Sequence, residues 1–421
     1  MLYLDNNMLY IYNYFALLSI IPRPFVTSWL KNYYNNVYIT ARDNMKAILC
    51  MILCVWGCLG FAPSLEAQEI KVVDGVEIIQ NTKKPTPSQG TPTKLTLEWE
   101  AVIGESDDPD KAFSQLTSFV VDYKGTIYAL DFKEQKIKVF DTDGQFIYAF
   151  GEQGQGPGEL QMPAGIHLAP NNELAVDDAL SKKMVYFTKE GKYLRENSYA
   201  TRLALMNLQM DPSGNFIGRE MKLEGQEMFF EVTKFDNDMN VLFTLDKIGF
   251  PVPLPGSGNK INMMDMISIY QFDRAGNIYY GRNRDYEIDM YTPQGELAKS
   301  IRKEYQPQKI SEKDKEDMLS RLDTVQNMGP VNLREMFEFP KMVPPFQMFT
   351  LDEQGRIIVR TWEKGKEEGE FVHDVFDPEG RFISQFTSKI TVSIWKKGKA
   401  YAIDENEDGF NVIIKYSVHW K

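Results

Sequence analysis

The stretch Asp122-Tyr-Lys-Gly125-Thr-Ile-Tyr-Ala-Leu-Asp131 joins a turn signal, Asp-x-x-Gly, to a short run of strand-forming residues. The same pattern begins again at Asp211, Asp273 and Asp352. A related phrase with a second turn occupies residues 138–147, 291–297 and 376–383. Two such phrases make four short strands per unit, and a repeat of four-stranded units predicts small sheets stacked radially in a β-propeller.

The repeat predicts six units. Their first turns are centred on Gly125, Asn172 (in place of Gly), Gly214, Gly276, Gly355 and Gly398. The last unit ends at Trp420 after only three strands, whereas a strand over residues 95–103 has no unit of its own. We therefore expect an all-β fold over residues 95–421. It should be a six-bladed β-propeller of four-stranded antiparallel blades, closed by the N-terminal strand.

Two insertions interrupt the repeat, at residues 246–266 and 306–345. The second contains Ser311 followed by acidic residues and a helix-forming run, which predicts an N-cap and a small helical insertion. Insertions in propellers gather on one face and often cover a ligand site. We expect the helical insertion to cap one mouth of the central channel.

The sequence of the N-terminal region predicts a signal for export, followed by a linker to the folded domain. Residues 45–67 combine a basic start, an apolar run and a small residue at the end, as in a secretory signal peptide. Residues 1–44 are interpreted as a leader that arises from a start-site error, with an extra N-terminal anchor as the alternative. Residues 68–94 contain a Pro/Thr-rich stretch that predicts a flexible linker. Cys58 stands in a loose lipobox, so a lipid anchor is the alternative to a cleaved signal.

The glycine-rich stretch at residues 150–160, together with residues 162–167 and 137–144, resembles the signature of NHL repeats. The chain is thus similar to the secreted six-bladed NHL-like propellers of Gram-negative bacteria, over roughly residues 95–421. The resemblance implies a binding scaffold. A minority of such propellers are enzymes, including a metal-dependent amidating lyase.

The charge balance limits the classes of partner. The formal net charge of −12 argues against nucleic-acid binding, which requires a basic footprint. The three cysteines all lie in the signal region, so the mature domain has no cysteine chemistry. We expect a monomer in the periplasm or on the cell surface, without a transmembrane span in the mature protein, that takes a protein, peptide or glycan ligand.

One position of the innermost strands is mostly polar. Five residues before each turn centre stand Val120, His167, Gln209, Gln271, Thr350 and Ser393. Since side chains alternate along a strand, this position faces away from the apolar one and predicts a wetter space, most simply the channel. His167, Gln209 and Gln271 are therefore candidate ligand-binding residues. The alternative is an ordinary water-filled channel lining.

Three consecutive units carry an arginine near the end of the second strand: Arg219, Arg282 and Arg360. Acidic residues stand there in the other units, where they are expected to hold backbone N–H groups of turns. Three guanidinium groups at one channel mouth would suit an anionic group on a peptide or an acidic glycan. The alternative is a belt of salt bridges to neighbouring acids.

The loop with Asp404, Asn406 and Asp408 matches the start of a Ca²⁺-binding loop, but Lys415 takes the place of the closing glutamate. A solvated hairpin loop is the alternative to this weak metal site, and no other cofactor is expected. The sequence favours a non-enzymatic binding or scaffold module. A metal-dependent hydrolase or lyase with its site in the channel is the alternative.

Overall fold

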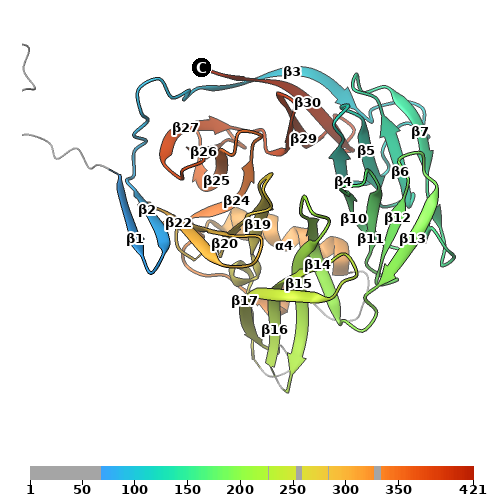
Figure 1. Ribbon diagram of the computed structural model, residues 1–421, viewed down its shortest axis with the longest axis horizontal. Helices are drawn as coiled ribbons and strands as arrows, with labels where there is room; N and C mark the ends of the chain where they lie inside the picture. Colours follow the sequence, from blue (N-terminus) through green and yellow to red (C-terminus); the bar gives the residue numbers. More distant parts are fainter. Residues whose placement is uncertain (1–67, 226, 253–257, 283, 327–332) are drawn as a thin grey trace, which may run out of the picture. The chain divides into compact units, whose positions relative to one another are not determined.

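The computed structural model describes residues 68–421 apart from residues 226, 253–257, 283 and 327–332. The leader, the signal peptide and Cys58 lie outside the described residues. The described residues belong to one compact unit, which contains six four-stranded antiparallel blades, as predicted (Figure 1). We number the blades 1 to 6 in chain order.

Each blade is a meander that runs from an inner to an outer strand. The inner strands are β4 (Leu116–Val121), β10 (Pro163–Leu168), β14 (Ala204–Met210), β19 (Ile269–Phe272), β24 (Phe346–Leu351) and β28 (Val392–Lys396). The second strands are β5 (Ile127–Asp131), β11 (Leu174–Asp178), β15 (Phe216–Glu224), β20 (Ile278–Gly281), β25 (Ile357–Lys364) and β29 (Lys399–Glu405). The third strands are β6 (Lys136–Phe140), β12 (Lys183–Phe187), β16 (Glu227–Phe235), β21 (Glu287–Tyr291), β26 (Phe371–Phe376) and β30 (Asn411–Trp420). The outer strands are β7 (Phe146–Phe150), β13 (Tyr193–Ser198), β17 (Val241–Pro251), β22 (Leu297–Lys303), β27 (Phe382–Ser388) and β3 (Leu95–Ile103).

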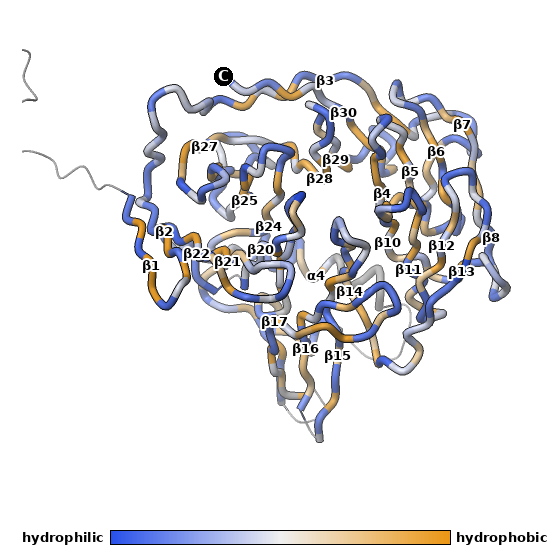
Figure 2. The backbone as a smooth tube through the Cα atoms, in the orientation of Figure 1, coloured by the Kyte–Doolittle hydropathy of each residue, from blue (hydrophilic) through white to orange (hydrophobic). Residues whose placement is uncertain are grey.

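The core lies between neighbouring blades, because each sheet buries one face against the blade before it and the other face against the blade after it. Between blades 4 and 5, for example, Ile288 and Ile301 pack with Phe346, Phe349 and Phe376, all of them buried. Apolar residues concentrate along the strands and polar residues at the turns (Figure 2). Burial between adjacent blades thus replaces a single central core.

The Asp-x-x-Gly signal forms the turn between first and second strands. In blade 1 the Asp122 carboxylate accepts hydrogen bonds from the backbone N–H groups of Lys124 and Thr126, at 2.8 and 3.0 Å. Gly125 adopts φ +91°, a conformation that side chains disfavour. The turn chemistry therefore holds the inner hairpin as the sequence predicts.

The N-terminal strand closes the ring as predicted. β3 pairs antiparallel with β30, from Leu95 opposite Trp420 to Ile103 opposite Ile413. This pairing makes β3 the outer strand of blade 6 and satisfies the edge that β30 would otherwise expose.

The structure corrects the prediction of a flexible linker over residues 68–94. β1 (Glu69–Val73) and β2 (Val76–Asn81) form a hairpin, and β2 pairs in parallel with β22 at the outer edge of blade 4. Farther on, the Thr86 N–H donates to the Phe382 carbonyl at 2.9 Å. We call residues 68–94 the N-terminal belt, because they follow the outer edges of blades 4 and 5. The prolines after β2 lack a backbone N–H and so interrupt regular strand pairing, but the residues between them keep enough backbone groups for these bonds.

The two insertions meet. The first begins inside β17, which extends to Pro251, and then forms β18 (Ile261–Asn262) and a 3₁₀ turn, Met263–Met266. The second forms α4 (Glu312–Gln326), a 3₁₀ turn at Leu333–Met336, and β23 (Phe337–Glu338), which pairs in parallel with β18. A small helical insertion is therefore confirmed, and its start is capped by Ser311 and Asp314, each of which accepts from the other's backbone N–H. A further short pair, β8 (Glu152–Gln153) with β9 (Glu159–Leu160), closes the glycine-rich loop.

Along the viewing direction of Figure 1, α4 projects across the central opening behind β14 and β19. Lys364, at the end of β25, forms an ion pair of 2.8 Å with Asp314 on this helix. The insertions thus lie at the end of the blades where second strands turn into third strands. No helix among the described residues is long and apolar enough to cross a membrane.

Candidate functional site

The polar position of the inner strands faces the next blade. The His167 ring packs edge-on against Phe216 of blade 3, with ring centroids 5.8 Å apart. At the same level of blade 5, Thr350 accepts a hydrogen bond of 3.0 Å from the indole N–H of Trp395 in blade 6. Burial lowers the pKa of the His167 imidazole to about 4, so the ring is neutral at pH 7. These side chains help to join blades; Gln209 and Gln271 share their register position and are half-buried.

Blade 6 is aligned differently from the sequence prediction. Lys397 and Gly398 make a two-residue turn between β28 and β29, with Lys396 paired to Lys399, so the longer Asp-x-x-Gly turn is missing. Ser393 lies at a β-bulge, where blades 1 and 5 have Thr117 and Gln347. The residue at the level of His167 in blade 6 is therefore Lys396 and not Ser393.

The three predicted arginines do not form one cluster. Arg360 donates to the Thr391 hydroxyl at 2.6 Å and stacks over Phe371, at the interface of blades 5 and 6. Arg219 lies over Phe230. It is on the same face of β15 as Ile217, which packs against Tyr270 and Tyr280 of blade 4. Burial at this interface lowers the pKa of the Arg219 guanidinium.

Arg282 occupies a different register position along the second strand from the other two arginines. It follows β20 one residue beyond the level of Arg219 and Arg360, so its side chain points to the opposite face of its blade. There it forms an ion pair with the buried carboxylate of Asp246 on β17 of blade 3. The structure therefore places Arg219 and Arg282 at one interface and Arg360 at another.

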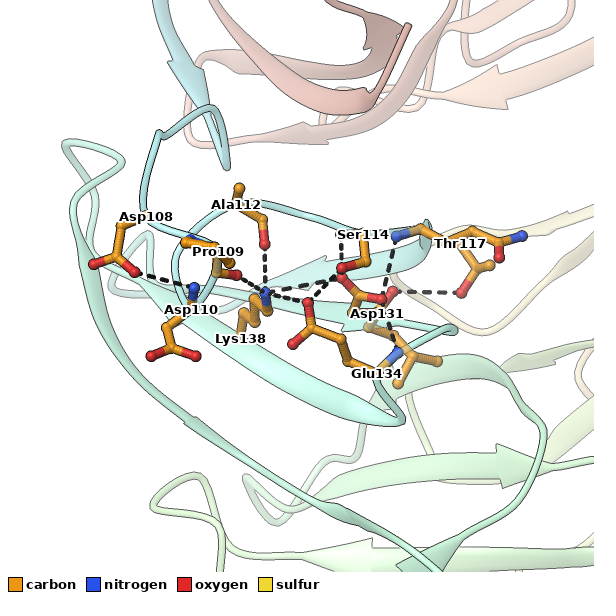
Figure 3. Close-up of polar contacts among 11 residues, drawn as sticks. Asp108, Pro109, Asp110, Ala112, Ser114, Thr117, Asp131, Glu134 and Lys138 are labelled. Atoms are coloured by element: carbon orange, nitrogen blue, oxygen red, sulfur yellow. Dashed lines mark hydrogen bonds and ion pairs between the residues drawn. The ribbon is translucent and has the colours of Figure 1, made fainter. Parts of the chain in front are cut away.

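In blades 1 to 3, an acidic residue stands at the strand position that Arg282 occupies in blade 4. This acidic residue has a structural role. Asp131 accepts from the backbone N–H groups of Ser114 and Gln115, at 2.7 and 3.2 Å (Figure 3). Asp178 does the same for Gln161 and Met162 in blade 2. These bonds confirm that the acids hold loops, as the sequence favoured. Blade 4 is the only blade in which a basic residue takes this level.

A pocket of about 340 Å³ opens beside Arg282, where the sequence of blade 4 departs from that of the other blades. We call it the Arg282 pocket. It is lined by Tyr280, Arg282, Arg284, Asp285, Glu287, Asp289 and Tyr291. All of these residues come from β20, β21 and the turn that joins them, at the end of blade 4 that carries the insertions.

The charges in the Arg282 pocket are arranged in two groups. The Arg282 and Arg284 side chains are at the exposed rim. Glu287 is half-buried and accepts hydrogen bonds from Ser300 and Arg302, at 2.5 and 2.8 Å. Asp289 has a buried Oδ1 atom with no hydrogen-bond partner among the described residues. Burial raises the pKa of the Asp289 carboxyl.

Tyr280 fixes one wall of the pocket. Its hydroxyl donates to Asp246 at 2.5 Å, on the same carboxylate that Arg282 binds through the other oxygen. Asp246 is thereby held by two donors from blade 4, and it is only 4% exposed. The pocket therefore combines a fixed wall with a rim of two guanidinium groups and a pair of half-buried carboxylates. Such a set can bind hydroxyl and anionic groups together.

The predicted metal loop is organised as a turn. The Asn406 side-chain oxygen accepts from the backbone N–H groups of Asp408 and Phe410, at 3.2 and 2.9 Å. Asp404 and Asp408 are exposed. Within the described part of the chain, no group of three or more His, Cys, Asp and Glu side chains has the geometry to hold a metal ion. A Ca²⁺ site at Asp404, Asn406 and Asp408 stays a prediction.

Comparison with known proteins agrees with this architecture. Residues 110–317 match the family DUF5128, described as a 6-bladed beta-propeller. The chain is a six-bladed β-propeller. A search of curated proteins gives no match. The narrower likeness to NHL repeats stays a prediction.

Solved structures of the same architecture cover most of this propeller. A protein of Bacteroides fragilis NCTC 9343, inferred to be exported, is 14% identical with a TM-score of 0.50, over 82% of this chain and 99% of that chain. A DUF4221 member from Bacteroides vulgatus ATCC 8482 is 10% identical (TM-score 0.48; 79% and 99% covered). Virginiamycin B lyase from Staphylococcus aureus is 10% identical (TM-score 0.40; 77% and 99% covered). At such identities the likeness shows the fold alone.

Proposed function

We propose that this propeller is a non-enzymatic binding module that takes an acidic saccharide in the Arg282 pocket. The observation that carries the proposal is the composition of this pocket, which is lined by the exposed side chains of Arg282 and Arg284 and by the half-buried carboxylates of Glu287 and Asp289. A uronic acid offers the complementary arrangement, because it has one carboxylate and several hydroxyl groups. The signal peptide expected at residues 45–67 supports a place in the periplasm or on the cell surface.

The hydroxyl groups of the sugar would face the half-buried carboxylates. An ionised carboxylate only accepts hydrogen bonds, and sugar hydroxyls donate them. The buried Oδ1 of Asp289 has no such donor among the described residues. Because an unpaired buried oxygen costs about 1–3 kcal/mol, a hydroxyl that reaches it gains affinity.

The carboxylate of the sugar would bind at the rim. Arg284 is exposed, and Arg282 keeps much of its guanidinium accessible, with 55% of its side chain exposed in spite of its ion pair with Asp246. A densely anionic ligand fits less well, since Asp285, Glu287 and Asp289 also line the pocket. The charge pattern therefore favours a ligand with few acidic groups and many hydroxyls over an acidic peptide.

The experiment is calorimetric titration of the full chain with oligomers of galacturonic and glucuronic acid, and with matched neutral oligomers. We expect Arg284→Ala to weaken binding of the acidic oligomers about tenfold, the cost of one charged hydrogen bond. Asp289→Asn should weaken binding of acidic and neutral oligomers alike. Arg274→Ala is the matched control: Arg274 is 74% exposed in the turn at the other end of blade 4, where it pairs with Glu353.

Two results would overturn the proposal. One is binding of acidic peptides without binding of any saccharide. The other is saccharide binding that is unchanged by both Arg284→Ala and Asp289→Asn while the variants remain folded, because the ligand would then use another part of the propeller.

A further inference from the structure

β1 has an open edge and no buried residue. All five of its residues are exposed, and Ile70, Val72 and Val73 retain 45%, 71% and 48% of their accessible surface. By contrast, the outer strands β7 and β13 alternate between exposed and half-buried residues. Among the described strands, β1 pairs with β2 alone. A strand with unpaired backbone groups and exposed β-branched side chains is a template for another strand.

The hairpin turn decides which backbone groups of β1 are available. Asp74 and Gly75 have φ values of +51° and +83°, and Val73 stands opposite Val76, as in a two-residue hairpin turn. The residues that flank such a turn bond to each other, and the bonding direction alternates along the strand. Val73, Lys71 and Glu69 therefore direct their N–H and C=O groups toward β2. Those of Ile70 and Val72 point to the open edge.

We propose that the open edge of β1 binds β1 of a second copy of this chain, antiparallel, about a two-fold axis at Ile70. In this register Ile70 lies opposite the partner's Ile70 as a hydrogen-bonded pair, and Val72 lies opposite the partner's Gln68. Glu69 then faces the partner's Lys71, and Lys71 faces the partner's Glu69. The sequence of β1 is thus complementary in charge to its own copy, which is the reason to choose a second copy as the occupant.

The other symmetric registers are worse. An axis at Lys71 sets Lys71 against the partner's Lys71, and like charges that face each other across strands are destabilising. An axis at Val72 sets Ile70 against the partner's Asp74, where the turn has already begun, so fewer residues can pair. If the axis passed between two residues, a residue whose backbone groups point to the open edge would lie opposite one whose backbone groups point to β2, so the two could not bond as a pair. An axis at Glu69 likewise sets two glutamates against each other, so within β1 only the axis at Ile70 satisfies both the backbone and the charges.

The resulting dimer differs from the monomer expected above, and it does not depend on the Arg282 pocket. The shared edge is short, so association is weak and depends on concentration. Within one chain, Lys71 already forms an ion pair of 2.7 Å with Glu69, and both side chains are more than half exposed. These charges can therefore exchange partners across the axis without burial.

The test is sedimentation equilibrium of the full chain over a wide concentration range, with a charge-swap pair. Glu69→Lys makes β1 entirely basic and Lys71→Glu makes it entirely acidic, so each variant alone should dimerise about tenfold more weakly than the wild type. Mixed in equal amounts, the two variants should form a heterodimer at least as well as the wild type forms its dimer. Melting temperatures should stay close to that of the wild type, because both side chains are exposed.

A wild-type chain that remains monomeric at every concentration overturns the proposal. So does a dimer that neither single variant weakens, since the copies would then associate through another surface. A mixture of the two variants that fails to associate overturns the register even if each variant alone is monomeric.

Discussion

The side-chain oxygen of Asn81 accepts a hydrogen bond of 2.8 Å from the backbone N–H of Phe382, 301 residues further along the chain. The amide nitrogen of Asn81 donates to the carbonyls of Arg302 and Gly380, both at 3.0 Å. Asn81 is completely buried and so bridges the outer strands of blades 4 and 5. The N-terminal belt is therefore an integral part of the propeller.

We expect Asn81→Ala to lower the free energy of unfolding by about 2–4 kcal/mol, because it leaves several buried backbone groups unpaired. Chemical denaturation measures the change. Gln80→Ala is the control, since Gln80 is only partly buried and makes a single long bond of 3.4 Å to a neighbouring carbonyl. Equal stability of the two variants would mean that the hydrogen bonds of Asn81 add nothing to the stability of the fold.

Removal of the belt tests the same idea on a larger scale. Deleting residues 68–90 should lower the melting temperature clearly, because Ile79 is fully buried among Ile301 and Phe382 and β2 covers the edge of β22. Deleting residues 68–104 should be more harmful and cause aggregation, because β30 then loses β3 as well. If the shorter deletion leaves the melting temperature unchanged, the belt lies on the blades without stabilising them.

Lys138 provides a third test. Its ammonium group is fully buried on β6, where it donates to the carbonyls of Pro109 and Ala112 and pairs with Glu134 at 2.8 Å (Figure 3). Lys138→Met should cost about 3–5 kcal/mol, because it leaves these groups without their cation. Amide hydrogen exchange in residues 108–115 should become faster, whereas Lys136→Met on the same strand should leave it unchanged. Protection that survives Lys138→Met would show that other contacts hold this loop.

A fourth test uses pH. Burial raises the pKa of the Asp177 carboxyl to about 6, although Tyr199 donates a hydrogen bond to it. The folded state therefore holds this proton more tightly than the unfolded state, whose pKa is near 3.8. The stabilisation is complete below about pH 4 and is lost as the pH rises through 6.

Asp177→Asn should remove this loss, because the amide cannot ionise. From pH 4 to pH 7, the variant should gain about 2–3 kcal/mol in stability relative to the wild type. Denaturation curves at several pH values measure the difference. Asp143→Asn, at an exposed turn position, should show no such trend. A constant difference between Asp177→Asn and the wild type would mean that Asp177 is ionised throughout.

The sequence predicted the repeated unit because its signals are local. Asp122 and Gly125 make a turn by themselves, and alternation along the next strand decides which side chains are buried. The missing fourth strand of the last blade could be inferred from the same periodicity, and β3 supplies it. The structural use of Asp131 also followed from turn chemistry.

The candidate site depended on information that is not local. A shift of one residue separates the level of Arg282 from that of Arg219 and Arg360, and in a strand such a shift reverses the face to which a side chain points. Only the pairing of the strands fixes that register. The sequence could have revealed the pocket in one way: Arg282 replaces an acid at the level of Asp131 and Asp178.

Local composition and periodicity thus determined the six blades, their turns and the closure of the ring, because each depends on residues within one unit or on a count of units. Tertiary structure alone decided the course of residues 68–94, the separation of the three arginines and the position of the Arg282 pocket. Those features depend on contacts between distant segments, such as Asn81 with Phe382 and Asp246 with Arg282. Such contacts form only when neighbouring blades are packed, and no pattern within a single blade encodes them.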